Sequence, residues 1–253
     1  MTNNKLCDQL RADLLALGLT SIAETFNEII DEAASKGWSL LQTVAYVIAH
    51  EAAARAERAI QRRIKRARLP KIKTLEDYDF EFPKKLPKQK ILRVFDCEFI
   101  QNHGNVVLIG NQGTGKTHLL TALGYIACQK GISVRFTRAV DMINELTTAQ
   151  INGTLGKALR AYTNPSCLLL DELGYLPVDK RGADLMFQVV AARYETGSIV
   201  ITTNRTFKDW GAIFDVDNTL ATALIDRLMH HGEAILIQGA SYRMKDREDV
   251  STQ

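Results

Sequence analysis

The chain has 253 residues, of which 46% are hydrophobic and 24% charged, a composition typical of globular proteins and not of disordered or fibrous ones. No stretch approaches the roughly 20 apolar residues that span a bilayer, so we expect no membrane association. Asp8 and Asp13 lie where an export signal would be basic and then apolar, which predicts a cytoplasmic protein. The four cysteines lack metal-ligand spacing and fit reduced thiols.

Residues 1–70 are predicted to form a small all-helical N-terminal domain. Apolar residues such as Leu10, Leu14 and Leu17 recur every three or four positions, as on one face of a helix. Gly18 and Gly37 separate the helices, and a longer helix is expected to begin after Ser39 and to end by Pro70.

Charge is distributed unevenly within this helical region. Residues 1–54 carry three Lys or Arg against seven Asp or Glu, whereas residues 55–73 carry nine basic residues against Glu57 alone. Such a run suits salt-dependent contacts with phosphates that do not depend on base identity. No aromatic residue interrupts it, which disfavours a single-strand stacking surface. A solvated charged face or a dock for an acidic partner is the alternative.

The predicted DNA-binding residues are Arg55, Arg58, Arg62, Arg63, Lys65, Arg66 and Arg68.

Residues 71–90 contain prolines and mixed charge and are predicted to be a linker to a second domain, residues 91–253. There, short apolar segments alternate with helical ones, which predicts an α/β fold with a central parallel sheet. The expected strands are 106–109, 134–136, 168–170, 198–202 and 234–237.

The first of these strands runs into GNQGTGKT at 110–117, which satisfies GxxxxGK[ST] and precedes a helical segment. The backbone N–H groups of such a loop converge on phosphates, the lysine reaches the β- and γ-phosphates, and the final hydroxyl ligates Mg²⁺. The sequence therefore predicts an ATP site. Its residues are Gly110, Asn111, Gln112, Gly113, Thr114, Gly115, Lys116, Thr117 and His118.

Two adjacent acids follow the strand at 168–170. Asp171 is predicted to bind Mg²⁺ together with Thr117. Glu172 is expected to point the opposite way along an extended chain, toward the γ-phosphate, as the base that activates water. With Lys116 as a further catalytic residue, the pattern predicts an ATPase.

Other candidate catalytic residues lie further along the chain. Asn204 follows the strand at 198–202 and is placed to orient the lytic water, whereas the threonines before it, 202 and 203, are expected to be strand-end hydrogen bonders. Arg227 is either a surface ion-pair partner or an arginine finger that acts on the ATP of a neighbouring subunit. His230 and His231 are not expected to bind metal, because no carboxylate or cysteine lies beside them at ligand spacing.

Several characteristic segments occur in a fixed order between about residues 74 and 247. They are TLEDYDF, GNQGTGKTHLLTALG, LLLDELGYLPVDKRGADLMFQVVAARYE, SIVITTNRTFKDW, and LIDRLMHHGEAI followed by GASYR. This region resembles the IstB family, helper ATPases of insertion sequences that are related to the DnaC helicase loaders within the AAA+ initiator group.

The resemblance implies an AAA+ ATPase that binds duplex DNA without sequence specificity, forms a homo-oligomer with ATP between subunits, and stimulates a partner transposase of the IstA type. It implies that Arg227 is the trans-acting arginine, that Asn204 is the polar sensor, and that Phe80 or Tyr78 lines the adenine pocket. Only about sixteen residues follow the last strand, so no C-terminal helical lid is expected, and Arg243 has no assigned role.

Two other functions are compatible with the sequence. A replicative helicase loader of the DnaC type would bind a hexameric helicase through the acidic residues 1–54. A nucleotide-gated scaffold would use ATP only to hold an oligomer together, although the pair Asp171 and Glu172 argues against it.

Overall fold

The computed structural model describes residues 3–82, 86–214 and 218–242 of the chain. The protein divides into two compact units, Met1–Arg62 and Arg63–Gln253. The division falls within a long helix, whose last turns belong to the second unit: Ala67 is fully buried there and Ile64 is partly buried.

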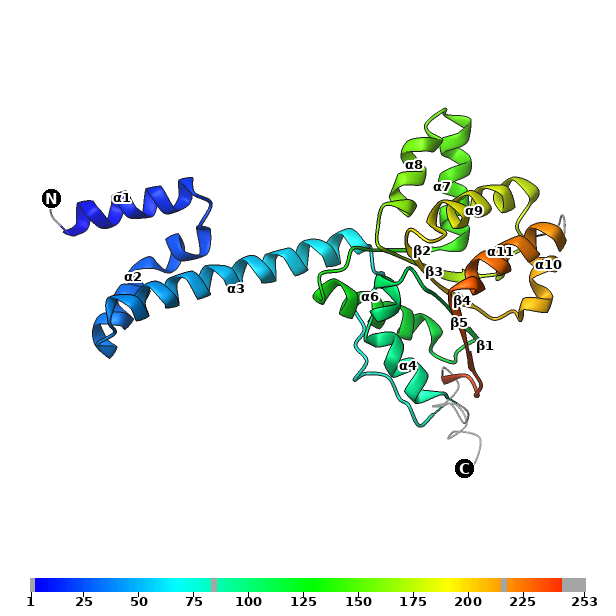
Figure 1. Ribbon diagram of the computed structural model, residues 1–253, viewed down its shortest axis with the longest axis horizontal. Coiled ribbons are helices and arrows are strands. Elements are labelled where there is room, and N and C mark those ends of the chain that lie inside the picture. The colour runs from blue at the N-terminus through cyan, green and yellow to red at the C-terminus, as the bar shows by residue number, and fades with distance from the viewer. Residues whose placement is uncertain (1–2, 83–85, 215–217, 243–253) are drawn as a thin grey trace, which may run out of the picture. The chain divides into compact units, whose positions relative to one another are not determined.

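The first unit contains α1 (Asn3–Ala16), α2 (Thr20–Lys36) and most of α3 (Leu40–Ala67), which confirms the predicted helical region (Figure 1). The first turn of α3 is capped as expected: the Gln42 amide donates to Ser39 Oγ (3.3 Å), and the Ser39 amide donates to Gln42 Oε1 (2.8 Å). The helix ends at Ala67, and the next residue, Arg68, has a left-handed φ of 56°.

The second unit is an α/β domain (Figure 1). Its elements are α4 (Lys88–Phe95), α5 (Glu98–Gln101), β1 (Asn105–Gly110), α6 (Lys116–Gln129), β2 (Val134–Arg138), α7 (Ala139–Ile151), α8 (Leu155–Thr163), β3 (Cys167–Leu173), α9 (Lys180–Arg193), β4 (Ser198–Thr203), η1 (Phe207–Asp209), α10 (Trp210–Ile213), α11 (Asn218–His230) and β5 (Gly232–Ile237).

The five strands form one parallel sheet in the order β2-β3-β4-β1-β5, which confirms the predicted sheet. Alternate residues of each strand face opposite layers of helices. On β1, Val107 and Ile109 pack with α7, α9 and α11, whereas Val106 and Leu108 pack with α4 and α6. Figure 1 shows these two layers on opposite sides of the sheet.

Because all strands are parallel, their carboxyl ends meet at one edge of the sheet, where α/β proteins bind ligands. The loops after β1, β3 and β4 open at this edge.

Residues 238–242, which follow β5, form no α-helix. Arg243 lies outside the described residues. Within the part of the chain that the structure describes, no helix is both long and apolar enough to cross a membrane.

Candidate nucleotide site and basic segment

The loop after β1 has the backbone conformation of a phosphate-binding loop. Gly113 and Gly115 have φ of 76° and 85°, a region that favours glycine. A Cβ at Gly115 would lie 2.5 Å from the Tyr78 ring, and one at Gly113 would lie 2.0 Å from Ser241 Oγ. Both positions therefore require glycine for conformation and for space.

The loop leads directly into α6, which begins at Lys116. The N–H groups of its first turn have no partner within the helix and carry a partial positive charge, which favours an anion at this position. Lys116 Nζ donates to the carbonyls of Gly110 (2.6 Å) and Asn111 (2.7 Å), so the ammonium group lies against the loop. The predicted phosphate-binding residues thus lie in one continuous loop and helix terminus.

Thr117 and Asp171 meet at the end of β3. The Thr117 hydroxyl donates to Asp171 Oδ1 at 3.1 Å, and the Asp171 carboxylate is buried, with 3% of the residue exposed. A hydroxyl and a carboxylate are hard oxygen ligands of the kind that Mg²⁺ prefers. The two side chains therefore fit a magnesium ion.

Glu172 also lies at this edge, but the prediction of an extended backbone there is wrong. The chain is not extended there: Glu172 has a φ of 60°, and the register between β3 and β4 shifts between Leu170 and Leu173. This bulge, and not strand alternation, directs the exposed Glu172 side chain into the cavity.

One threonine connects both acids. The Thr202 hydroxyl donates to Asp171 Oδ1 and accepts from the Glu172 amide at 2.9 Å. Thr203 Oγ1 donates to the Leu173 carbonyl at 2.8 Å, so both threonines are strand-end hydrogen bonders, as expected. The bridging position of Thr202 depends on β3 and β4 being neighbours, which no sequence motif indicates.

These side chains surround a cavity of about 310 Å³. Nine of the residues predicted for the nucleotide site line it, including Asn204, whereas Gly110, Asn111, Asp171 and Arg227 do not. The lining residues are Asp77, Tyr78, Asp79, Phe82, Gln112, Gly113, Thr114, Gly115, Lys116, Thr117, His118, Glu172, Tyr175, Thr202, Thr203, Asn204 and Tyr242.

Aromatic residues from outside the P-loop form one side of this cavity. Tyr78, 8% exposed, donates its hydroxyl to the Thr114 carbonyl at 3.1 Å, and burial together with the nearby Asp79 raises its pKa to about 12. Phe80 packs edge-to-face on Tyr78 but does not line the cavity. Phe82, which was not predicted as a site residue, also lines the cavity, and its ring centre lies 5.0 Å from that of Tyr242.

Arg227 does not line the cavity of its own chain. On α11, it donates to the Ala223 carbonyl (3.2 Å), and its guanidinium group lies 4.7 Å from the centre of the Phe187 ring on α9.

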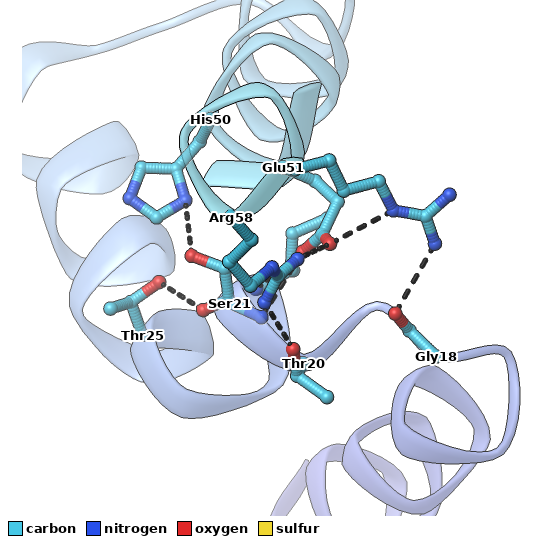
Figure 2. Close-up of polar contacts among 9 residues, drawn as sticks. Gly18, Thr20, Ser21, Thr25, His50, Glu51 and Arg58 are labelled. Carbon is cyan, nitrogen blue, oxygen red and sulfur yellow. Dashed lines mark hydrogen bonds and ion pairs between the residues drawn. The ribbon is translucent and has the colours of Figure 1, made fainter. Parts of the chain in front are cut away.

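In the first unit, part of the basic run surrounds a buried acid (Figure 2). Glu51 on α3 is only 4% exposed. Its Oε2 accepts from the amides of Ser21 (3.1 Å) and Ile22 (3.2 Å) in the first turn of α2. Its Oε1 accepts from Arg55 (3.1 Å) and Arg58 (2.7 Å).

Two of the seven predicted DNA-binding residues therefore have contacts inside the helical unit. Arg55 also donates to the Gly18 carbonyl (3.2 Å) and Arg58 to Thr20 Oγ1 (2.5 Å). Of the other five, Arg63 is half-buried, whereas Arg62, Lys65, Arg66 and Arg68 are exposed.

A parallel sheet with a P-loop after β1, and paired acids at the carboxyl end of β3, which β4 separates from β1, defines an ATP-binding protein of the AAA+ class. Residues 12–250 match the model of the family described as IstB-like ATP binding protein, and the chain belongs to that family.

The chain is 36% identical over 238 residues to an ATP-binding protein named for insertion sequence IS232 of Bacillus thuringiensis subsp. berliner, covering 94% of this chain and 95% of that one. It is 35% identical to the corresponding IS21 protein of Pseudomonas aeruginosa, with 94% and 90% covered.

Two solved structures show the same fold. The structure of AMPPCP-bound DnaA from Aquifex aeolicus is similar with a TM-score of 0.57 and 22% identity, covering 74% of this chain and 57% of that one. The DnaC helicase loader is similar with a TM-score of 0.54 and 25% identity, covering 65% and 96%.

Proposed function

We propose that this protein is the ATP-hydrolysing helper of an insertion sequence, which assembles on duplex DNA as a homo-oligomer and stimulates a partner transposase. The observation that carries the proposal is the convergence of Lys116, Thr117 and Glu172 on one cavity, with Asp171 beneath it. The insertion-sequence names of the relatives support the transposition context.

Each side chain has a chemical part in ATP hydrolysis. Lys116 and the N–H groups at the start of α6 bind the β- and γ-phosphates, and Asn204 orients the attacking water. Glu172 accepts a proton of this water as its oxygen attacks the γ-phosphorus, and the bond from the γ-phosphorus to the β–γ bridging oxygen breaks, so that ADP leaves. Asp171 and Thr117 would hold a Mg²⁺ ion, which would supply positive charge to neutralise the phosphate oxygens.

The arginine that such a reaction uses is supplied by a second subunit in our proposal. Arg227 lies away from its own cavity, and a neighbouring chain would place it against the γ-phosphate, where it stabilises the charge of the transition state. Assembly would then be required for hydrolysis.

The DNA contacts in the proposal come from the basic run. Arg62, Lys65, Arg66 and Arg68 are exposed and meet phosphates, whereas Arg55 and Arg58 support the fold around Glu51 as well. Binding by phosphate contacts weakens as salt rises and tolerates any base sequence.

The test is ATP hydrolysis by the full chain with and without duplex DNA across a salt series. We expect DNA to stimulate hydrolysis, salt to remove the stimulation, and the double variant Arg62→Ala/Arg66→Ala to lose it. Glu172→Gln is expected to bind ATP and DNA without hydrolysis. A rate of ATP hydrolysis that does not change when DNA is added, or that is unchanged in Glu172→Gln, would contradict the proposal.

A helicase loader is the second candidate, because this chain aligns with 96% of the DnaC helicase loader. Co-purification with the transposase of the same element or with a hexameric replicative helicase distinguishes the two. Binding to the helicase alone would replace the transposition role.

A further inference from the structure

A cluster of possible metal ligands lies outside the nucleotide site. Glu195 follows α9, His230 is the last residue of α11, and His231 precedes β5. The sequence does not predict metal binding by the two histidines, because no carboxylate is expected beside them at ligand spacing. The fold supplies one, because α9 packs beside α11.

The three side chains are spaced as the ligands of one ion would be. Glu195 Oε1 lies 3.4 Å from His231 Nε2 and 3.9 Å from His230 Nδ1, and the three ligand atoms all lie within 4.8 Å of one another. Ligands at about 2.0–2.1 Å from a tetrahedral zinc ion are roughly 3.4 Å apart. Side-chain adjustments of under about 1 Å would therefore close the site.

The backbone on both sides of the cluster is fixed. Before Glu195, the buried guanidinium of Arg193 donates to five carbonyl groups, with donor–acceptor distances of 2.7 to 3.2 Å. At the other side, the His231 carbonyl accepts from the Asn105 amide (3.0 Å), and the Leu228 carbonyl accepts from Asn105 Nδ2 (3.2 Å). A site on such anchored segments loses little freedom when it binds an ion.

The positions of the two imidazole rings are also defined by contacts. Their centres lie 4.2 Å apart, and the Tyr194 hydroxyl lies 2.7 Å from His230 Nδ1. In the ion-free protein this contact orients the ring, and a bound ion would take the same nitrogen. Each of the three ligand side chains is about half exposed, so an ion can enter from solvent and keep a water as its fourth ligand.

We propose that Glu195, His230 and His231 form a zinc site that links the end of α9 to the end of α11. Two imidazole nitrogens and a carboxylate oxygen are a ligand set for Zn²⁺, whereas Mg²⁺ and Ca²⁺ prefer oxygen ligands alone. The site is separate from the nucleotide cavity and does not depend on the function proposed above.

The test is Zn²⁺ binding by the untagged full chain, measured by competition with a chromogenic chelator, without nucleotide and with excess Mg²⁺. We expect one Zn²⁺ per chain and a higher melting temperature with zinc. Glu195→Gln and His231→Ala should each weaken binding by about tenfold or more, since even outer-shell changes cost 10- to 100-fold.

The matched control is His103→Asn, which removes an exposed histidine outside the cluster and suits its φ of 53°. It should bind zinc as the unchanged chain does. Circular dichroism without zinc checks that every variant is folded. The proposal would be overturned if the unchanged chain shows no saturable zinc binding, or if both cluster variants bind zinc as tightly as the unchanged chain.

Discussion

At the scale of single residues, the geometry of the site depends on side chains outside the P-loop and the acid pair. Tyr78 holds the P-loop through the Thr114 carbonyl, and Thr202 holds both acids. Because the pKa of Tyr78 is about 12, its hydroxyl remains a donor over the whole neutral range. The P-loop sequence predicts which residues contact phosphate, whereas these supports come from other parts of the chain.

Thr202→Val is predicted to reduce hydrolysis more than ATP binding. Valine fills the same buried space in a strand but cannot bridge Asp171 and the Glu172 amide. We expect kcat to fall on the order of tenfold, with the Kd for ATP changed less, because the substitution misplaces groups that act in the chemical step. Single-turnover hydrolysis and equilibrium binding of a nucleotide analogue measure the two effects.

The control for this prediction is Thr121→Val. Thr121 is equally buried, but its hydroxyl donates only to the carbonyls of Thr117 and His118 within α6. If both valine variants lose the same activity, the loss reflects general destabilisation and the bridging role of Thr202 is wrong.

At the scale of secondary-structure elements, the start of α2 is stabilised from elsewhere in the chain. The residue before this helix is Leu19, whose side chain cannot cap it. The carboxylate of Glu51 on α3 accepts from the first-turn amides instead. Helical periodicity predicted both helices, but a cap that is about thirty residues away has no local signal.

Glu51→Gln is predicted to destabilise the helical unit and to remove part of its acid sensitivity. Burial raises the pKa of Glu51, but the Ile22 amide, Arg55 and Arg58 outweigh it, so the folded pKa lies below the ordinary value. The stabilising contribution is therefore complete above the unfolded pKa of about 4.3 and is lost as pH falls through the folded pKa.

At neutral pH we expect Glu51→Gln to lower the free energy of unfolding of the helical unit by about 1–2 kcal/mol. Glutamine can still accept a hydrogen bond from one amide, but it loses the charge that faces two partly exposed arginines. Hydrogen-exchange rates of the Ser21 and Ile22 amides, measured between pH 7 and about pH 3, report this destabilisation and its dependence on pH. Glu57→Gln, which alters an exposed carboxylate on the same helix, should change neither rate.

At the scale of the whole molecule, strand patterning and the P-loop predicted the α/β unit, because alternating burial and the fixed loop spacing are local properties. The bulge at Glu172 and the meeting of Glu195 with His231 were not predictable in this way. Both result from packing between segments that are distant in sequence.

Mixing two inactive variants tests whether Arg227 acts between subunits. Arg227→Ala keeps its own Glu172, and Glu172→Gln keeps its own Arg227, so mixed oligomers contain some sites with both groups. At equal amounts, roughly a quarter of the sites should hydrolyse ATP if the arginine acts in trans. Hydrolysis by the mixture that stays at the level of the separate variants would contradict trans action.

Asn105 connects the start of β1 to both β4 and α11. Its side chain accepts from the Ile199 amide (2.8 Å) on β4 and donates to the Leu228 carbonyl of α11, at the start of β1. The other end of β1 is Gly110, the first residue of the P-loop. In the assembly that we propose, a force that a neighbouring subunit exerts on α11 would therefore be transmitted along β1 to the P-loop.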